Sequence, residues 1–141
     1  MKSLQQYLAT HPISVTIVAV FVLFITAWNG IRIFGAVAEW TTLAVFNANP
    51  VYIFASGLAW VIAGLALYES LVNGRRFARQ AGLILSVLYM TWYWLDRWFM
   101  QANPAGNAGF SAVASTVMLV IFNILLYWPS SHAYFTRRQD E

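Results

Sequence analysis

The sequence predicts an all-α membrane protein: an antiparallel bundle of four transmembrane helices that forms a single domain, residues 1–141. Composition is the first observation, because 60% of the residues are apolar and 9% are charged, against roughly 45–50% and 25% in soluble domains. The second is three charge-free runs of 18 or 19 residues, at 13–31, 51–68 and 110–128, which is about the length of a membrane-spanning helix. A shorter run, 81–95, becomes long enough when its flanking arginines and tryptophans lie in the headgroup layer.

The first span is expected at about residues 13–35, with polar residues only near its far end. Asn29 and Arg32 lie there. At about 1.5 Å per residue, Arg32 is about 29 Å from Ile13, close to the whole hydrocarbon thickness. The run exceeds the roughly 7–15 apolar residues of a leader, so we expect a retained span and no cleavable signal peptide.

A short interfacial helix is expected between the first and second spans. Residues 33–50 keep one acid, Glu39, beside Trp40, and this mixture is typical of an amphipathic segment that lies on the membrane surface. Asn49 and Pro50 then supply a break before the next span.

The second span is expected at about residues 51–72, with small residues at spacings that let helices approach closely. They are Ala55, Ala59 and Ala63 at every fourth position, and Gly57 and Gly64 seven apart. One interpretation is a packing spine for the bundle. The other is that alanine and glycine are common in membrane helices.

Basic residues predict the orientation in the membrane. Arg75, Arg76 and Arg79 lie between spans two and three, and with Lys2, Arg137 and Arg138 they place six basic residues on one side; Arg32 and Arg97 fall on the other. The positive-inside rule then predicts that both termini lie in the cytoplasm. The three hairpin arginines serve as a topology anchor or bind anionic lipid headgroups.

The third span is expected at about residues 78–101, and its polar face ends at Asp96. When each span is measured from its cytoplasmic start, Asp96 and Arg32 fall at about the same depth. Because a carboxylate at such a depth is costly unless paired, we expect a structural ion pair between them, with Asn29 and Tyr93 completing the hydrogen bonds. The alternative is a binding site for a zwitterionic headgroup.

The fourth span is expected at about residues 109–129, followed by a polar tail. Asn123 is the lone amide of this span, and such an amide usually bonds to a neighbouring membrane helix. We expect residues 130–141 to be a frayed tail.

Tryptophan is distributed unevenly along the chain. Five of the seven tryptophans lie toward the predicted outer end: Trp28, Trp40, Trp92, Trp94 and Trp98. One interpretation is interfacial anchoring. The other is a contact surface that includes Trp40, Trp94 and Trp98, since aromatic residues dominate binding hot spots.

Several function classes are excluded by what the sequence lacks. It has no cysteine, hence no disulfide, thiolate nucleophile or iron–sulfur cluster. It also has no phosphate-binding glycine loop, Gly-x-Ser-x-Gly elbow or His-Glu-x-x-His motif. We expect no enzyme, no metal and no cofactor, and the net charge of +3 is too small to indicate a nucleic-acid partner.

Three motifs resemble those of a group of uncharacterised small four-span bacterial integral membrane proteins. They are a glycine and a tryptophan in the second span, Gly57 and Trp60; the Gly-Arg-Arg-x-Ala-Arg hairpin of residues 74–79; and the Tyr-Trp-Leu-Asp-Arg end of the third span, residues 93–97. The resemblance covers about residues 12–130. It implies the fold and the topology, with a location in a bacterial inner (cytoplasmic) membrane, and no activity.

Two functional hypotheses follow. The first is a non-enzymatic structural, assembly or accessory subunit that acts through lateral helix contacts, as a homo-oligomer or within a larger membrane complex, and that binds membrane lipids. The second is an oligomeric small-solute transporter or channel. The central thirds of the spans carry no ionisable residue, which argues against a proton relay within one protomer.

Overall fold

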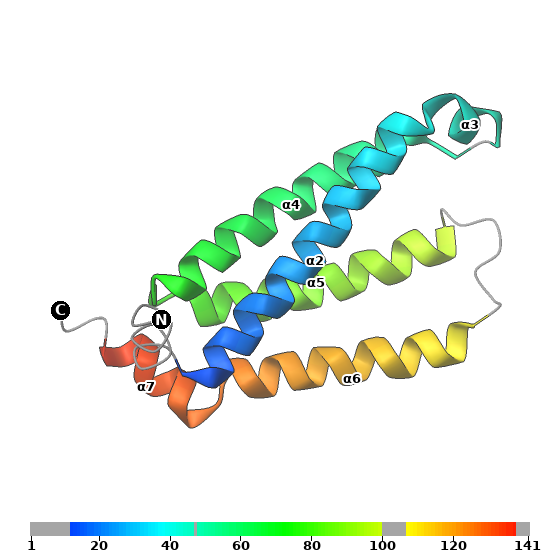
Figure 1. Ribbon diagram of the computed structural model, residues 1–141. Coiled ribbons are helices and arrows are strands. Elements are labelled where there is room, and N and C mark those ends of the chain that lie inside the picture. The colour runs from blue at the N-terminus through cyan, green and yellow to red at the C-terminus, as the bar shows by residue number, and fades with distance from the viewer. Residues whose placement is uncertain (1–11, 47, 100–106, 138–141) are drawn as a thin grey trace, which may run out of the picture.

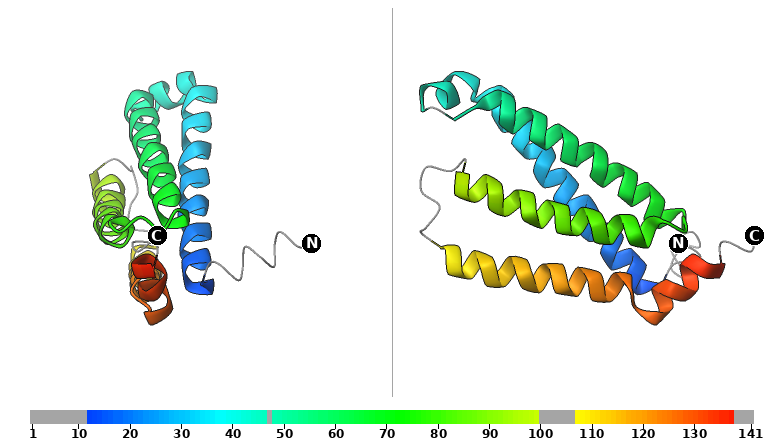
Figure 2. Two further views of the ribbon diagram at one scale, coloured as in Figure 1. Left: turned by 90° about the vertical axis from the view of Figure 1, so that its left-hand side faces the viewer. Right: turned by 180° about the vertical axis from the view of Figure 1, so that it is seen from behind.

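The computed structural model describes residues 12–46, 48–99 and 107–137, and no strand occurs among them (Figure 1). The helices are α2 (Ile13–Ala38), α3 (Trp40–Val45), α4 (Pro50–Val72), α5 (Ala78–Phe99), α6 (Ala108–Leu126) and α7 (Pro129–Arg137). Long helices that follow one another in sequence run in opposite directions (Figures 1 and 2). The predicted all-helical class is therefore confirmed.

Three of the helices, α2, α4 and α6, are long and apolar enough to cross a membrane. This agrees with the prediction of a membrane protein. The 22-residue α5 is not among them, because charged residues at both of its ends lower its mean hydropathy. Three of the four predicted spans are thus supported by length and composition.

The observed helix ends differ from the predicted spans by a few residues. α2 continues to Ala38 before the chain bends into the six-residue α3. α4 begins at Pro50, where the Asn49 side chain caps the helix by accepting a 3.1 Å hydrogen bond from the Tyr52 backbone N–H. It ends before Gly74, whose φ of 64° suits glycine. Residues 100–101 of the predicted third span lie outside the described residues.

α2 and α4 form the closest helix pair, and the glycines of α4 explain why. A Cβ added to Gly64 would lie 2.1 Å from Thr26 Oγ1, and one added to Gly57 would lie 3.2 Å from the Asn29 carbonyl oxygen. Ala55 and Ala59 are exposed instead. The packing spine therefore consists of the two glycines, which are seven residues apart and share one face of the helix, and not of the alanine column.

The buried apolar core lies near one end of the bundle, which we call the basic end because residues 73–79 turn the chain there. Its members come from α2, α4, α5, α6 and α7: Val15, Val18, Val22, Leu67, Leu71, Ala78, Phe122, Leu126, Tyr134 and Phe135. Toward the opposite end, which we call the far end, no described residue joins this cluster. The helices are consequently held together most tightly at the basic end.

The expected frayed tail is a helix, α7, packed against the basic end (Figure 1). Phe135 is 2% exposed, the Tyr134 hydroxyl donates a 2.7 Å hydrogen bond to the Val72 carbonyl, and the hydroxyls of Ser131 and Ser14 lie 2.7 Å apart. The sequence predicts a frayed tail because serines, histidine and arginines outnumber the apolar residues there. Burial of two rings and one serine decides the outcome for residues 129–137; residues 138–141 lie outside the described residues.

Candidate functional site: a charged aromatic cluster beside an apolar cavity

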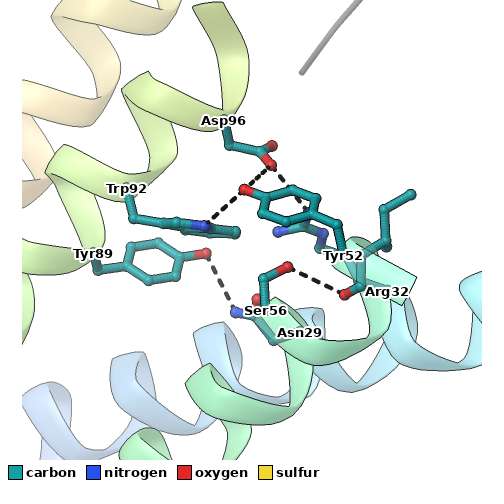
Figure 3. A network of polar contacts seen from close by, with 8 residues as sticks. Asn29, Arg32, Tyr52, Ser56, Tyr89, Trp92 and Asp96 are labelled. Carbon is teal, nitrogen blue, oxygen red and sulfur yellow. Dashed lines mark hydrogen bonds and ion pairs between the residues drawn. The ribbon is translucent and has the colours of Figure 1, made fainter. Parts of the chain in front are cut away.

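Three helices bring an arginine, a tyrosine and an aspartate together near the far end (Figure 3). Arg32 of α2 places a guanidinium nitrogen 3.6 Å from Asp96 Oδ1 of α5, and the Tyr52 hydroxyl of α4 donates a 2.9 Å hydrogen bond to the same oxygen. The Arg32 and Asp96 side chains are only 21% and 12% exposed. The carboxylate is therefore satisfied from two directions by neighbouring helices.

An aromatic wall backs the ion pair. The Trp92 indole N–H donates a 3.2 Å hydrogen bond to the Tyr52 oxygen, and the Arg32 guanidinium lies 4.7 Å from the centre of the Trp92 ring. Trp60 and Tyr89 continue the wall, with ring centres 4.9 Å apart. Cation–π contact and ring packing stabilise the largely buried arginine.

Asn29 and Tyr93, expected to complete the hydrogen bonds of the ion pair, have other partners. The fully buried Asn29 donates to the Ile25 carbonyl at 2.9 Å and to the Tyr89 hydroxyl at 3.3 Å. The Tyr93 oxygen accepts from Arg97, one turn further along the same helix, at 3.5 Å. The rotation of each helix about its axis directs both side chains away from the ion pair.

Sequence reasoning did not assign Tyr52 or Trp92 to the ion pair. Tyr52 lies in the first turn of α4, and Trp92 lies one turn before Asp96 on α5. A signal for both existed, since each has a polar group at about the depth of Arg32. It could not be used, because the sequence does not show which face of α4 meets α5.

Asn123, expected to bond to a neighbouring helix, links α6 to α5. Its side-chain nitrogen donates to the Ser86 hydroxyl at 3.3 Å and to the Leu119 carbonyl of its own helix at 2.9 Å. The hydrogen bond lies inside the bundle, away from the charged cluster.

The tryptophans expected to share one contact surface are dispersed. Trp40 is exposed on α3 and Trp98 is 59% exposed on α5, and α3 lies apart from the end of α5 in every view (Figures 1 and 2). Trp94 is half-buried, with its ring centre 5.5 Å from that of Tyr93 and the Arg97 guanidinium 6.0 Å away. Of the three, Trp98 is the exposed one on a long helix.

The hairpin arginines are arranged differently from one another. Arg75 forms an exposed 2.6 Å ion pair with Glu69, Arg76 is exposed, and the Arg79 guanidinium lies 4.5 Å from the centre of the Tyr127 ring of α6. An exposed ion pair contributes about 1 kcal/mol or less. Arg79 joins α5 to α6 at the basic end.

An apolar cavity of about 510 Å³ lies among α2, α4, α5 and α6, next to the charged cluster. Aromatic and aliphatic side chains supply most of its walls, among them Phe21, Trp28, Trp60, Tyr89, Met118 and Leu119. Its volume falls in the roughly 300–1,000 Å³ range of small-molecule sites. Tyr89 belongs both to the cavity wall and to the aromatic wall of the ion pair, so the two features are continuous.

The charged cluster and the cavity together offer surfaces suited to binding. Asp96 and Arg32 are held by one another and by Tyr52, and across residues 12–46, 48–99 and 107–137 no group of three or more histidine, aspartate or glutamate side chains could hold a metal ion. The cavity contributes apolar contact area and aromatic faces.

Comparisons of the chain with protein-family models, with curated proteins and with solved structures find no match.

Proposed function

We propose that the chain is a small, non-enzymatic integral membrane protein that crosses a bacterial inner membrane four times and acts as an accessory or assembly subunit through lateral helix contacts. The observation that carries the proposal is the two-faced character of α5. Its polar face is directed into the bundle, and its apolar face is left exposed.

The inward face of α5 supports its assignment as a membrane span in addition to α2, α4 and α6. Ser86, Tyr89 and Asp96 each engage a neighbouring helix through a hydrogen bond or an ion pair. Its 22 residues extend about 33 Å at about 1.5 Å per residue, enough to cross the hydrocarbon core. Pairing removes much of the cost of its polar groups in lipid, which a hydropathy average does not register.

The outward face of α5 supports lateral contacts. Its exposed apolar residues are Leu83, Ile84, Val87, Leu88, Leu95, Trp98 and Phe99. A large apolar face that ends in two aromatic rings is suited to packing against another membrane helix, because rings offer large contact area at low entropic cost. We propose that this face meets a second copy of the chain or a larger membrane complex.

The ends of the helices support cytoplasmic termini. The 73–79 hairpin and α7 lie at the same end of the bundle (Figure 1), so that Arg75, Arg76, Arg79 and Arg137 fall together, whereas Arg32 and Arg97 are nearer the far end. This is the partition that the positive-inside rule associates with a cytoplasmic basic end.

The experiment is a measurement of particle mass in mild detergent for the parent chain and two variants. Trp98→Leu removes the ring and the N–H donor from the proposed contact, and Trp128→Leu removes a similarly exposed tryptophan at the basic end. We expect an oligomer, or a complex with other membrane proteins, in the parent and in Trp128→Leu, and a smaller particle in Trp98→Leu.

A strictly monomeric parent chain, or an unchanged particle in Trp98→Leu, contradicts the assembly role. A symmetric oligomer that conducts small solutes in vesicles would support the transporter instead.

A further inference from the structure

We infer that the apolar cavity is a binding site for one acyl chain of a membrane glycerolipid, which enters from the bilayer between α2 and α6. The inference adds a ligand to the molecule, and it does not depend on the assembly contact of α5, which lies on the outer face of the bundle.

The first argument is the opening of the cavity. Phe24 and Trp28 of α2 and Met118 of α6 line it and are also exposed to the outside, by 65%, 54% and 53%. The cavity therefore opens sideways between these two helices. Both helices are long and apolar enough to cross a membrane, so the opening faces hydrocarbon rather than water.

The second argument is the closed end of the cavity. The rings of Phe21 and Phe122 lie 5.7 Å apart between α2 and α6, and both belong to the cavity wall. Beyond them begins the buried core of the basic end. From Phe21 to Trp28 the cavity follows α2 for about 10 Å at about 1.5 Å per residue, which is a slot with one closed end and an open side.

The third argument is the lining, which favours hydrocarbon over water. No charged residue contributes to the wall. The hydroxyls of Thr26, Ser86 and Ser115 donate to backbone carbonyls of their own helices, at 2.8, 2.9 and 3.2 Å. A buried water molecule needs two to four polar partners, whereas an alkyl chain gains dispersion contacts with apolar walls.

The fourth argument places a carbonyl group at the far end of the chain. Tyr89 and Tyr93 line the cavity, and their oxygens accept hydrogen bonds from Asn29 and Arg97. Each hydroxyl proton is left to donate, and no hydrogen bond donated by either hydroxyl occurs among the described residues. In hydrocarbon an unpaired donor is costly, and the ester carbonyl of a lipid is a neutral acceptor at the end of an alkyl chain.

The arrangement of these donors favours an ester over a quinone. Tyr89 and Tyr93 lie one turn apart on α5, about 6 Å along the helix, so both donors come from one wall. A quinone ring has its two carbonyls on opposite edges and is best held by donors from opposite walls. The wall across the cavity from α5 is α2, which offers Thr26, whose hydroxyl bonds to its own backbone, and Trp28, which lies exposed at the opening.

The test uses the full chain purified in mild detergent, freed of lipid and then supplied with either dioleoyl phosphatidylglycerol or ubiquinone. Native mass spectrometry counts the molecules that each protomer retains. Ser115→Phe puts a ring into the cavity, and Val113→Phe puts the same ring on the exposed side of the same helix. Ala63→Phe fills the cavity from α4 and serves as a second filled variant should Ser115→Phe fail to fold.

We expect the parent and Val113→Phe to retain about one phospholipid each, and the filled variants to bind it at least about tenfold more weakly, a factor that corresponds to 1.4 kcal/mol. Tyr89→Phe with Tyr93→Phe should weaken retention without blocking the slot. A parent chain that retains no phospholipid, filled variants that retain as much as Val113→Phe, or retention of ubiquinone in preference to phospholipid would each overturn the inference. Particle mass, read in the same spectra, reports separately on the assembly contact.

Discussion

The Tyr52 hydroxyl donates its hydrogen bond to Asp96 Oδ1, the same carboxylate oxygen that lies 3.6 Å from the Arg32 guanidinium. One oxygen thus connects α2, α4 and α5. The distance from arginine is longer than the roughly 2.7–2.9 Å of a direct charged hydrogen bond, so the tyrosine makes the shorter contact. Arg32, Tyr52 and Asp96 together therefore form a junction of three helices.

Removal of the Asp96 carboxylate alone should destabilise the protein more than removal of both charges. Asp96→Ala leaves the Arg32 guanidinium without its counter-ion. We expect a loss of about 2 kcal/mol, below the roughly 3–5 kcal/mol of a fully buried pair because Arg32 is partly exposed. Arg32→Met combined with Asp96→Ala should recover part of that loss. Thermal unfolding in detergent measures both, with Glu69→Ala as the exposed-pair control.

A double variant that is less stable than Asp96→Ala would show that the arginine is well accommodated without the carboxylate. That result would favour the alternative hypothesis of a zwitterionic-headgroup site, because a lone guanidinium binds a phosphate group.

A methyl group at Gly64 should separate α2 from α4. Its Cβ would lie 2.1 Å from Thr26 Oγ1 and 3.2 Å from Thr26 Cβ, so one helix must shift. We expect Gly64→Ala to lower stability by about 1–3 kcal/mol, the usual range for overpacking. Gly30→Ala is the matched control, since a Cβ there would meet no side chain and no other helix within 4 Å. Equal melting temperatures for the two variants would place the helices further apart than described.

Truncation of Phe135 should loosen α7 from the basic end. The ring is 2% exposed and lies in the core cluster, so Phe135→Ala should lower stability by about 3 kcal/mol, in line with other buried phenylalanines. His132→Ala, on the exposed side of the same helix, should have little effect. Protease digestion provides a second measurement, with faster cleavage near residue 130 expected only in Phe135→Ala. Identical digestion of the two variants would mean that α7 does not depend on this contact.

Cysteine labelling should distinguish the two ends of the bundle. The chain contains no cysteine, so an impermeant thiol reagent has no background. Arg76→Cys and Thr41→Cys both replace exposed residues, one in the basic hairpin and one in α3. In intact cells we expect labelling of Thr41→Cys alone, and labelling of Arg76→Cys after the membrane is permeabilised. The reverse pattern would invert the proposed topology.

The depth of residues along each helix could be predicted from the sequence. Arg32 and Asp96 were expected at one level because rise accumulates at about 1.5 Å per residue, and the structure brings them to 3.6 Å. The charge-free runs likewise predicted α2, α4 and α6, because a membrane helix needs about twenty apolar residues. The spacing of Gly57 and Gly64 likewise predicted a close approach between helices, although it does not identify the partner helix.

The rotation of each helix and the choice of its neighbours were decided only by the tertiary structure. Whether Asn29 meets Asp96 or Tyr89 depends on a turn of a few tens of degrees about the α2 axis, and membrane helices are apolar on most of their surface, so hydrophobic periodicity does not set that angle. The helical structure of the tail was likewise decided by tertiary contacts, because α7 is stabilised by Leu71, Leu126 and Val72 of distant segments rather than by its own composition. The cavity was also decided by the tertiary structure. It is the space left where four helices diverge, so it cannot be predicted from any single segment of the sequence.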